Sequence, residues 1–374
     1  MKKTNILFVL PNFDTGGSEK LVVDIATKLN RRKFNPLICV FFSGFYETIV
    51  SRFSIPLFVI HDQKILTKKQ VCLKLNRIIK ENSVHVVNSH HSSPLIQGVI
   101  PFKILNRLCW IHTEHTRLDL DPHITKKILL YEKICLKFVD GCVGISDGVC
   151  EFFKHELRVK PQKVFKIYNG VDDEKYLLSD EEKKQIRTSY RQEFGIQENE
   201  VVIGLFANFR KQKNHLCLVK AIGRLKDGGI TNFRILFAGD GPERKTVEDE
   251  AERRGVKENI LFLGSRSDIP ELLTAIDIYC LPSFFEGLPL SLIEAAIAKK
   301  TLVASHVIGN IDVINEINSG TLFESDNDEE LSDILLHYII DGEKLTSDQC
   351  IDIGNNLKMS GMIRKYESLF SITQ

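Results

Sequence analysis

One turn in the second half of the chain brings together a glycine, a proline and a helix start. Residues 283–289 follow the apolar run at 276–282 and precede a helical pattern at 291–300. Proline suits the first turn of a helix, where its missing N–H group costs no hydrogen bond. The free N–H groups of such a turn attract anions. We therefore predict a phosphate site formed by Gly287, Leu288, Pro289 and Leu290.

Two carboxylates flank this turn. Glu286 lies in the loop before it, and Glu294 lies eight positions later on the predicted helix. Ionised carboxylates accept hydrogen bonds from hydroxyl groups, so one can hold a ribose diol and the other a sugar hydroxyl or ring. Two glutamates alone could be ordinary solvated residues. Their placement after a strand and across a Gly-Pro turn favours a binding role.

A basic loop follows the apolar run at 201–207. It contains Arg210 and Lys213, with Asn208 just before them. Arginine offers a planar fork and lysine a point charge, and both suit a diphosphate. These side chains could offset charge on a leaving diphosphate electrostatically, as a metal does elsewhere. The alternative is a solvated basic loop.

Two further segments of the second half are included in the predicted donor site. Gly241 belongs to a glycine-rich loop after the run at 233–238, and glycine lets the backbone approach a ligand closely. Arg266 follows the run at 259–264. The glycine loop could also be only a turn.

The first half offers a glycine pair and two histidines. Gly16 and Gly17 open a helical pattern directly after the first apolar run, which predicts an anion or substrate site. The pattern is not GxGxxG, so a dinucleotide site is not indicated. His112 and His115 close the run at 108–115, where a strand end favours a cleft. A structural histidine is the alternative for each.

These residues need strands and helices to position them. Short β-branched or aromatic runs alternate with helical patterns in both halves of the chain. This alternation predicts an α/β protein with two Rossmann-like, doubly wound parallel sheets, whose ligands bind at the carboxyl ends of the strands. We place the domains at 1–180 and 181–354, with a helix at 355–374 that crosses back to the first domain.

Composition excludes several classes of protein. The 374 residues are 43% hydrophobic and 26% charged, and no apolar stretch is long enough to span a membrane. The nine cysteines include no CxxC pair, which indicates reduced thiols in the cytoplasm and no structural zinc. We find neither a serine–histidine–aspartate set nor a GxSxG motif. Nothing indicates a nucleic-acid partner.

Charge is divided unevenly between the two halves. Residues 1–170 carry 26 Lys and Arg against 14 Asp and Glu, whereas the remaining residues carry an acidic excess. The segment 64–80 reads as a basic amphipathic helix with Val71, Leu75, Ile78 and Ile79 on one stripe. Such a helix can lie on an anionic bilayer, although the same stripe would also pack onto its own sheet. We expect a cytoplasmic protein that contacts the inner face of the membrane.

Taken in order, seven segments resemble the GT-B-fold retaining glycosyltransferases of family 4, also called glycosyl transferases group 1. They are GGSEK, HTEH, VGIS, YNGVD, QKNH, FAGDGPE and LPSFFEGLPLSLIEA. The last segment carries that family's E-x7-E motif with Glu286 and Glu294. The resemblance covers nearly the whole chain.

The resemblance implies a role for each site residue. Glu286 would contact the donor sugar, Glu294 the ribose, and Arg210 and Lys213 the diphosphate. The first domain would bind the acceptor and the second the nucleotide sugar. Gly16 and Gly17 would line the cleft beside the phosphates and the acceptor, and one histidine, with His115 preferred over His112, would lie near the donor sugar. The implied reaction moves a hexose or N-acetylhexosamine, with retention, from a UDP-sugar to a glycan or lipid-linked acceptor of capsule, O-antigen or exopolysaccharide synthesis.

The chain departs from the family pattern at two places. The family's arginine precedes the lysine by five or six residues, where this chain has Asn208, so Arg210 would act from a shifted position. Asp312 stands where the family often has a glutamate. Asp119 and Asp121 resemble the metal-binding DxD of another glycosyltransferase class, but Pro122 follows them and we interpret the segment as a loop. We predict no required metal or other cofactor.

Three other functions are compatible with this fold. A nucleotide-sugar epimerase needs a set of carboxylates for proton abstraction, and a phosphorylase needs a lysine that binds pyridoxal phosphate; neither pattern is apparent. A non-catalytic nucleotide-sugar-binding subunit would have no need of Glu286, Lys213 and Glu294.

Overall fold

The computed structural model consists of two compact units of α/β structure. It describes residues 3–14, 16–62, 64–105, 108–118, 125–176, 178–340 and 355–372. The first unit contains residues 1–170 and 359–374, and the second contains residues 171–358. The predicted boundaries at 180 and 354 fall ten and four residues away, because residues 171–180 and the segment before Met359 belong to the second unit.

A seven-stranded sheet forms the centre of the first unit, in the order β3-β2-β1-β4-β5-β6-β7. All of its strand pairs are parallel. Its strands are β1 (Thr4–Leu10), β2 (Phe34–Val40), β3 (Leu57–Val59), β4 (Val86–His90), β5 (Cys109–Glu114), β6 (Gly141–Gly144) and β7 (Val164–Lys166).

Helices cover both faces of this sheet and bury one apolar cluster on each. One face packs against α1 (Gly17–Lys28), α2 (Glu47–Arg52) and the C-terminal helix α14 (Met359–Ile372). The other packs against α3 (Lys68–Glu81), α4 (Ser92–Leu105), α5 (Lys126–Cys135) and α6 (Asp147–Glu151), which runs into the π-helix η2 (Phe152–Glu156). The short 3-10 helix η3 (Pro161–Lys163) precedes β7.

The second unit repeats this design with six parallel strands, in the order β10-β9-β8-β11-β12-β13. The strands are β8 (Val201–Phe206), β9 (Phe233–Ala238), β10 (Ile260–Phe262), β11 (Ile278–Leu281), β12 (Thr301–Ser305) and β13 (Thr321–Phe323). The predicted fold of two parallel α/β sheets is therefore confirmed.

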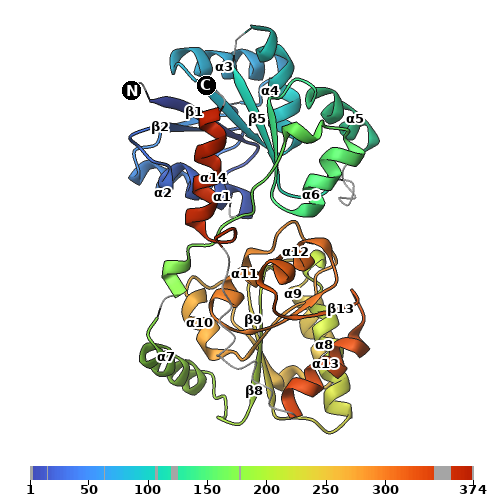
Figure 1. The fold of residues 1–374 in the computed structure, drawn as a ribbon. Coiled ribbons are helices and arrows are strands. Elements are labelled where there is room, and N and C mark those ends of the chain that lie inside the picture. Colours follow the sequence, from blue (N-terminus) through green and yellow to red (C-terminus); the bar gives the residue numbers. More distant parts are fainter. Residues whose placement is uncertain are drawn as a thin grey trace. The chain divides into compact units, whose positions relative to one another are not determined.

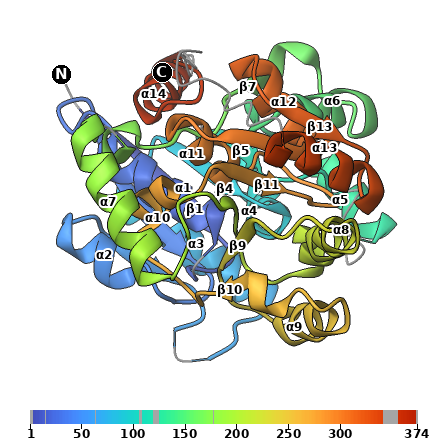
Figure 2. The same cartoon turned by 90° about the horizontal axis from the view of Figure 1, so that it is seen from below.

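The helices of the second unit also lie on both faces of its sheet. One face packs against α8 (His215–Asp227), α9 (Arg244–Arg253) and α13 (Asp328–Ile340), and α8 and α13 lie side by side (Figure 2). The other elements are α7 (Asp180–Glu193), α10 (Ile269–Ala275), α11 (Leu290–Ile297), α12 (Ile308–Ile317) and the 3-10 helices η4 (Asp173–Tyr176), η5 (Lys211–Lys213) and η6 (Lys257–Asn259).

Helix α3 corrects one expectation from the sequence. The helix forms as predicted, with a capping box between Thr67 and Gln70. Its stripe of Val71, Leu75 and Ile78 is buried in the core of the first unit, so this stripe cannot insert into a bilayer while the protein is folded. Within the described parts of the chain, every helix is too short or too polar to span a membrane.

Helix α14 returns the end of the chain to the first strands. Figure 1 shows it (red) beside β1 (blue), and the backbone N–H of Asn30 donates to Glu367 Oε1, 337 residues away in the chain. Phe370 is fully buried, and its ring centroid lies 6.0 Å from that of Phe8 and 6.4 Å from that of Phe34. The last helix is therefore part of the first unit's core.

This packing predicts a large loss of stability for Phe370→Ala. Removing a buried phenylalanine leaves a cavity and costs about 3–5 kcal/mol. Denaturant unfolding should show this loss, while Ile340→Ala, at an exposed position on α13, should change the unfolding free energy by less than about 0.5 kcal/mol. Equal and small effects of the two substitutions would show that α14 does not complete the core.

Candidate functional site

Two loops at the carboxyl ends of neighbouring strands are joined in the second unit. The loop after β8 contains Gln212, and the loop after β11 contains Phe284 and Phe285. The Phe284 N–H donates to Gln212 O over 2.8 Å, and Gln212 Nε2 donates to Phe285 O over 2.8 Å. The two loops are thus held in a fixed register.

Glu286 and Lys213 form an ion pair across these loops. Lys213 Nζ donates to Glu286 Oε1 over 2.6 Å, and Ser283 Oγ donates to the same oxygen over 2.5 Å. The glutamate side chain is 6% exposed and the lysine side chain 20% exposed. A charge-assisted bond in such surroundings is short and strong. The structure therefore brings together a carboxylate and an ammonium group that the sequence places 73 residues apart.

Glu294 lies on the second turn of α11, which begins after Pro289. Pro289 is the residue that caps this helix rather than its first member. Glu294 forms a hydrogen bond with Tyr176, whose pKa is raised by burial and by the charge of Glu294. Its carboxylate is half-buried. The first N–H groups of α11 have no acceptor within the helix, as at any helix start.

The other residues of this unit that were predicted to bind the sugar donor differ in whether their side chains already form hydrogen bonds or ion pairs. Arg210 and Asn208 are exposed, and no side-chain hydrogen bond holds Arg210 among the described residues. Arg266 instead forms a two-point ion pair with Asp268, whose carboxylate also accepts from Tyr190. Arg266 is therefore already occupied, whereas Arg210 is free to meet an anion.

Two glycines are required where these loops pack against each other. Gly241 has a φ of +154°, and a Cβ atom there would lie 2.5 Å from Phe209 O. A Cβ atom at Gly309 would lie 2.7 Å from Gly287 O. Gly241 thus lets the loop after β9 lie against the loop after β8, and Gly309 lets the start of α12 lie against the Glu286 loop.

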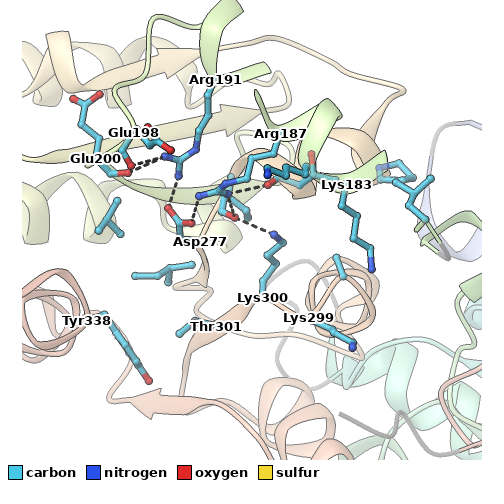
Figure 3. Close-up of a pocket in the computed structure, with 18 of the residues that line it drawn as sticks. Lys183, Arg187, Arg191, Glu198, Glu200, Asp277, Lys299, Lys300, Thr301 and Tyr338 are labelled. Carbon is cyan, nitrogen blue, oxygen red and sulfur yellow. Dashed lines mark hydrogen bonds and ion pairs between the residues drawn. The ribbon is translucent and has the colours of Figure 1, made fainter. Parts of the chain in front are cut away.

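The second unit also contains a cavity of about 540 Å³, whose lining includes Tyr176, the partner of Glu294. Its lining includes Val201, Ile278 and Thr301, the first residues of β8, β11 and β12, so it lies at the amino ends of the strands. Figure 3 shows Arg187 and Arg191 pointing toward Asp277, at 2.5 and 2.6 Å. These ion pairs tie α7 to the sheet, and none of the predicted donor residues lines the cavity.

Lys300 lies beside these ion pairs, as Figure 3 shows. Its ammonium group donates to Ile276 O over 3.0 Å. Burial and the nearby charge of Arg187 lower the pKa of Lys300 to about 8. Two of the basic residues around this cavity, Arg187 and Arg191, therefore fix α7 against the strand ends.

In the first unit, the segment that contains Gly16 and Gly17 is linked by a hydrogen bond to a histidine that follows β4. Gly17 is the first residue of α1, and Gly16 precedes it, where a Cβ atom would lie 2.0 Å from Glu19 Oε2. Ser18 Oγ donates to Glu19 Oε2 over 2.7 Å and lies 2.9 Å from His91 Nε2. The start of α1 is thereby linked to the end of β4.

His115 ends a chain of hydrogen bonds that runs from β4. The Nδ2 group of Asn88 lies 2.9 Å from Thr113 Oγ1 and 3.5 Å from Ile111 O, and a carbonyl oxygen can only accept. The amide oxygen of Asn88 therefore accepts from His90 Nε2, 3.1 Å away. His90 Nδ1 is then left as the acceptor for His115 Nε2, at 2.9 Å.

This chain determines which nitrogen of His115 carries the proton. Burial holds the pKa values of His90 and His115 well below the usual histidine range, and the neighbouring His91 lowers them further. Both rings are neutral at pH 7. With its proton on Nε2, His115 presents an unprotonated Nδ1, which has no hydrogen-bond partner among the described residues. That nitrogen can accept a hydrogen bond from a hydroxyl group.

His112 lies in a different environment. It is fully buried, and its Nε2 atom lies 3.7 Å from both Glu114 and Glu132. Burial alone would lower the pKa of His112, but the two carboxylates raise it to about 9. The geometry therefore separates the two histidines: His115 keeps a small exposed surface and His112 has none.

His112, Glu114 and Glu132 are the one group of metal-ligand type among the described residues. Their ligand atoms lie within 4.8 Å of one another. An ion held there would lie in the interior of the first unit. A protonated His112 would itself neutralise the negative charge of one of the two carboxylates. Asp119 and Asp121, which resemble a DxD motif, lie outside the described residues.

Several partners of the site do not follow from the sequence. Ser283 and Gln212 stand inside segments that it examined, but their contacts depend on which strands are neighbours. Asn88 and His90 belong to the segment VVNSH, in which the apolar residues indicate only a strand. A polar Asn-x-His pair at the end of an apolar strand was the signal that could have found them.

Two family models match successive parts of the chain. The model described as Glycosyltransferase Family 4 matches residues 15–175, and the model described as Glycosyl transferases group 1 matches residues 186–355. Together they cover both units, and each match corresponds closely to one unit.

Known proteins resemble the chain over most of its length. An N-acetyl-α-D-glucosaminyl L-malate synthase of Bacillus anthracis is 25% identical over 80% of this chain and 75% of its own length. A UDP-Gal:α-D-GlcNAc-diphosphoundecaprenol α-1,3-galactosyltransferase of Escherichia coli is 27% identical over 67% of this chain and 65% of its own. The crystal structure of Anabaena Alr3699/HepE in complex with UDP has a TM-score of 0.85 at 22% identity, covering 99% of this chain and 100% of that one.

The chain of hydrogen bonds through His90 predicts a measurable tautomer. In protein labelled with ¹⁵N at histidine, long-range ¹H–¹⁵N correlation spectra should show His90 and His115 neutral and protonated on Nε2 near pH 7. A substitution of His115 would assign its signals. A neutral His115 with its proton on Nδ1 would show that the amide of Asn88 has the opposite orientation and that the chain of donors is reversed. A charged ring would contradict the lowered pKa of His115.

Proposed function

We propose that this chain, which belongs to the glycosyltransferases of group 1 and family 4, transfers a hexose or N-acetylhexosamine from a UDP-sugar to a glycan or lipid-linked acceptor, with retention of configuration. The family membership rests on the two models that match both units. The relative from Escherichia coli is named for a UDP-sugar donor and a diphosphoundecaprenol acceptor, which supports this choice of substrates and a role in surface polysaccharide synthesis.

The observation that carries the proposal is the pair of Glu286 and Lys213 at the carboxyl ends of adjacent strands, with Glu294 on the following helix. Parallel α/β sheets bind ligands at this edge. The spacing Glu286 to Glu294 places one carboxylate in the loop and the other on the second turn of α11. We assign Glu294 to the ribose and Glu286 to the donor sugar.

The leaving diphosphate is assigned to Lys213 and Arg210. In the structure Lys213 is neutralised by Glu286, whereas Arg210 is exposed and has no side-chain partner among the described residues. A bound diphosphate would share the ammonium group of Lys213 and recruit Arg210. These cations would stabilise the charge that develops as the bond from the anomeric carbon to the phosphate oxygen breaks.

For retention, the new bond to the acceptor oxygen forms on the same face of the sugar from which the phosphate leaves. The leaving phosphate oxygen takes the proton of the acceptor hydroxyl. Glu286 then acts as a negative charge beside the ring, where positive charge develops in the transition state. The protein's part is positioning and electrostatic stabilisation. His115 Nδ1 is suited to accept a hydrogen bond from a donor-sugar hydroxyl.

The alternatives have less support. A nucleotide-sugar epimerase would need carboxylates that reach its substrate, but Glu114 and Glu132 are enclosed with His112 in the first unit. A non-catalytic subunit would not need a buried ion pair at the donor site, which costs free energy of desolvation when it is assembled.

The two glutamates should affect catalysis in different ways. Glu286→Gln removes a charge that acts mainly in the transition state, so kcat should fall about 100-fold with little change in donor KM. Glu294→Ala removes a ribose contact that is equal in both states, so the Kd for UDP should rise about tenfold. Transfer of labelled sugar and calorimetry of UDP binding measure the two effects.

A matched control is Glu329→Gln, an exposed carboxylate on α13. It should leave both quantities unchanged. Glu286→Gln and Glu294→Ala enzymes that match the control would contradict the site assignment.

Transfer should also proceed without a divalent cation, because Lys213 and Arg210 supply positive charge at the diphosphate. Initial rates in excess EDTA should equal those in magnesium within about twofold. A rate that falls in EDTA and returns with manganese or magnesium, while thermal unfolding is unchanged, would contradict this assignment.

A further inference from the structure

Helix α5 exposes an unusual amount of apolar surface. Leu130 is 58% exposed, Tyr131 48%, Ile134 38% and Phe138, just after the helix, 40%. Single exposed apolar residues are ordinary on protein surfaces, but a contiguous group indicates an interaction site. In the described part of the second unit, the large exposed apolar residues are limited to Phe284 and Ile340.

The rotation of α5 is fixed by its inner side. Thr125 caps the helix by accepting from the N–H of Ile128. On the inner side, Glu132 is buried and accepts from Ser92 Oγ over 2.7 Å, and Cys135 and Leu136 pack into the core. The helix cannot turn its outer residues inward without exposing these, so the outer face remains available to a partner.

The charged residues on this outer side of α5 are basic. Lys126, Lys127 and Lys137 are exposed, and Lys127 lies 5.9 Å from the centre of the Tyr131 ring. The only acidic residue of the helix, Glu132, points to the core. We call the group Lys126, Lys127, Leu130, Tyr131, Ile134, Lys137 and Phe138 the α5 face.

We propose that the α5 face is a docking surface for an anionic lipid bilayer. An apolar stripe bordered by lysines is the pattern of a helix that lies in the plane of a membrane interface. The apolar side chains would enter the boundary between headgroups and acyl chains, and the lysines would meet the lipid phosphates. A second copy of the chain fits less well, because a symmetric contact would bring like charges together.

Helix α3 extends the basic surface. Helices α3, α4 and α5 contact one another in sequence on the same face of the first sheet. On α3, Leu73 is 61% exposed, and Lys69 and Arg77, four positions to either side, are exposed as well. The basic helix thus contributes its charged outer side to membrane contact, while its predicted apolar stripe is used in the core.

The inference deepens the proposed function, because it rests on a lipid-linked acceptor as the reason for membrane contact. The first unit, to which acceptor binding is assigned, would be held at the surface where such an acceptor resides. The binding itself can be measured without any transferase activity, so the two proposals can fail separately.

The test is co-sedimentation of the full chain with vesicles. We expect binding to vesicles of equal parts phosphatidylglycerol and phosphatidylcholine, little binding to phosphatidylcholine alone, and a steep loss with added salt. Lys126→Glu/Lys127→Glu and Leu130→Ser/Ile134→Ser should each weaken binding at least about tenfold. Thermal stabilisation by UDP should stay unchanged in both variants, which shows that they are folded.

Matched controls come from the second unit. Lys245→Glu/Lys257→Glu makes the same change of charge at exposed positions, and Ile340→Ser removes an exposed apolar residue. Both should bind vesicles like the original protein. The proposal is overturned if the original protein stays in the supernatant with anionic vesicles, or if the α5 variants bind as well as the controls. A dimer in solution that Leu130→Ser/Ile134→Ser dissociates, without vesicle binding, would assign the face to a second copy and would also overturn it.

Discussion

Every strand pair in both sheets is parallel, and the candidate site depends on this constraint. A parallel pair requires a crossover connection, so each strand ends at the same edge as its neighbour and the next loop begins there. Lys213 and Glu286 meet because β8 and β11 are neighbours despite the two strands between them in sequence. In the first unit the same rule brings Ser18 to His91, because β1 and β4 are neighbours.

The two ends of the second sheet differ in how their charged groups are paired. At the amino ends, Arg187 and Arg191 are paired with Asp277, so these two charges hold α7 against the sheet. At the carboxyl ends, Lys213 and Glu286 are paired, but Arg210 is exposed and the first N–H groups of α11 lack helical acceptors. The cavity thus lies at the opposite end of the sheet from the candidate donor site. The exposed guanidinium group of Arg210 and the N–H groups of α11 are the donors that we propose for a phosphate group.

The sequence was sufficient for the fold and for part of the site. The alternation of short apolar runs with helical patterns indicated the parallel sheets. The motif around Glu286 and Glu294 indicated the loop and the helix on which these two glutamates lie. Contacts that depend on strand order, such as the bond of Lys213 to Glu286, could not be derived from spacing. The role of Val71 and Leu75 was misjudged because an apolar stripe looks the same whether it meets a sheet or a bilayer. The outward apolar residues of α5 were not recognised, because only packing shows which side of a helix is left uncovered.

The most direct test of the account is photoaffinity labelling with an azido derivative of UDP, followed by mapping of the labelled peptides. The proposed nucleotide site lies at the carboxyl ends of β8 and β11. This position predicts label in the segments around Lys213 and Glu294 and protection of both by unlabelled UDP. Label confined to the peptides that carry Arg187 and Lys300, which border the cavity at the amino ends, would contradict the donor site described above.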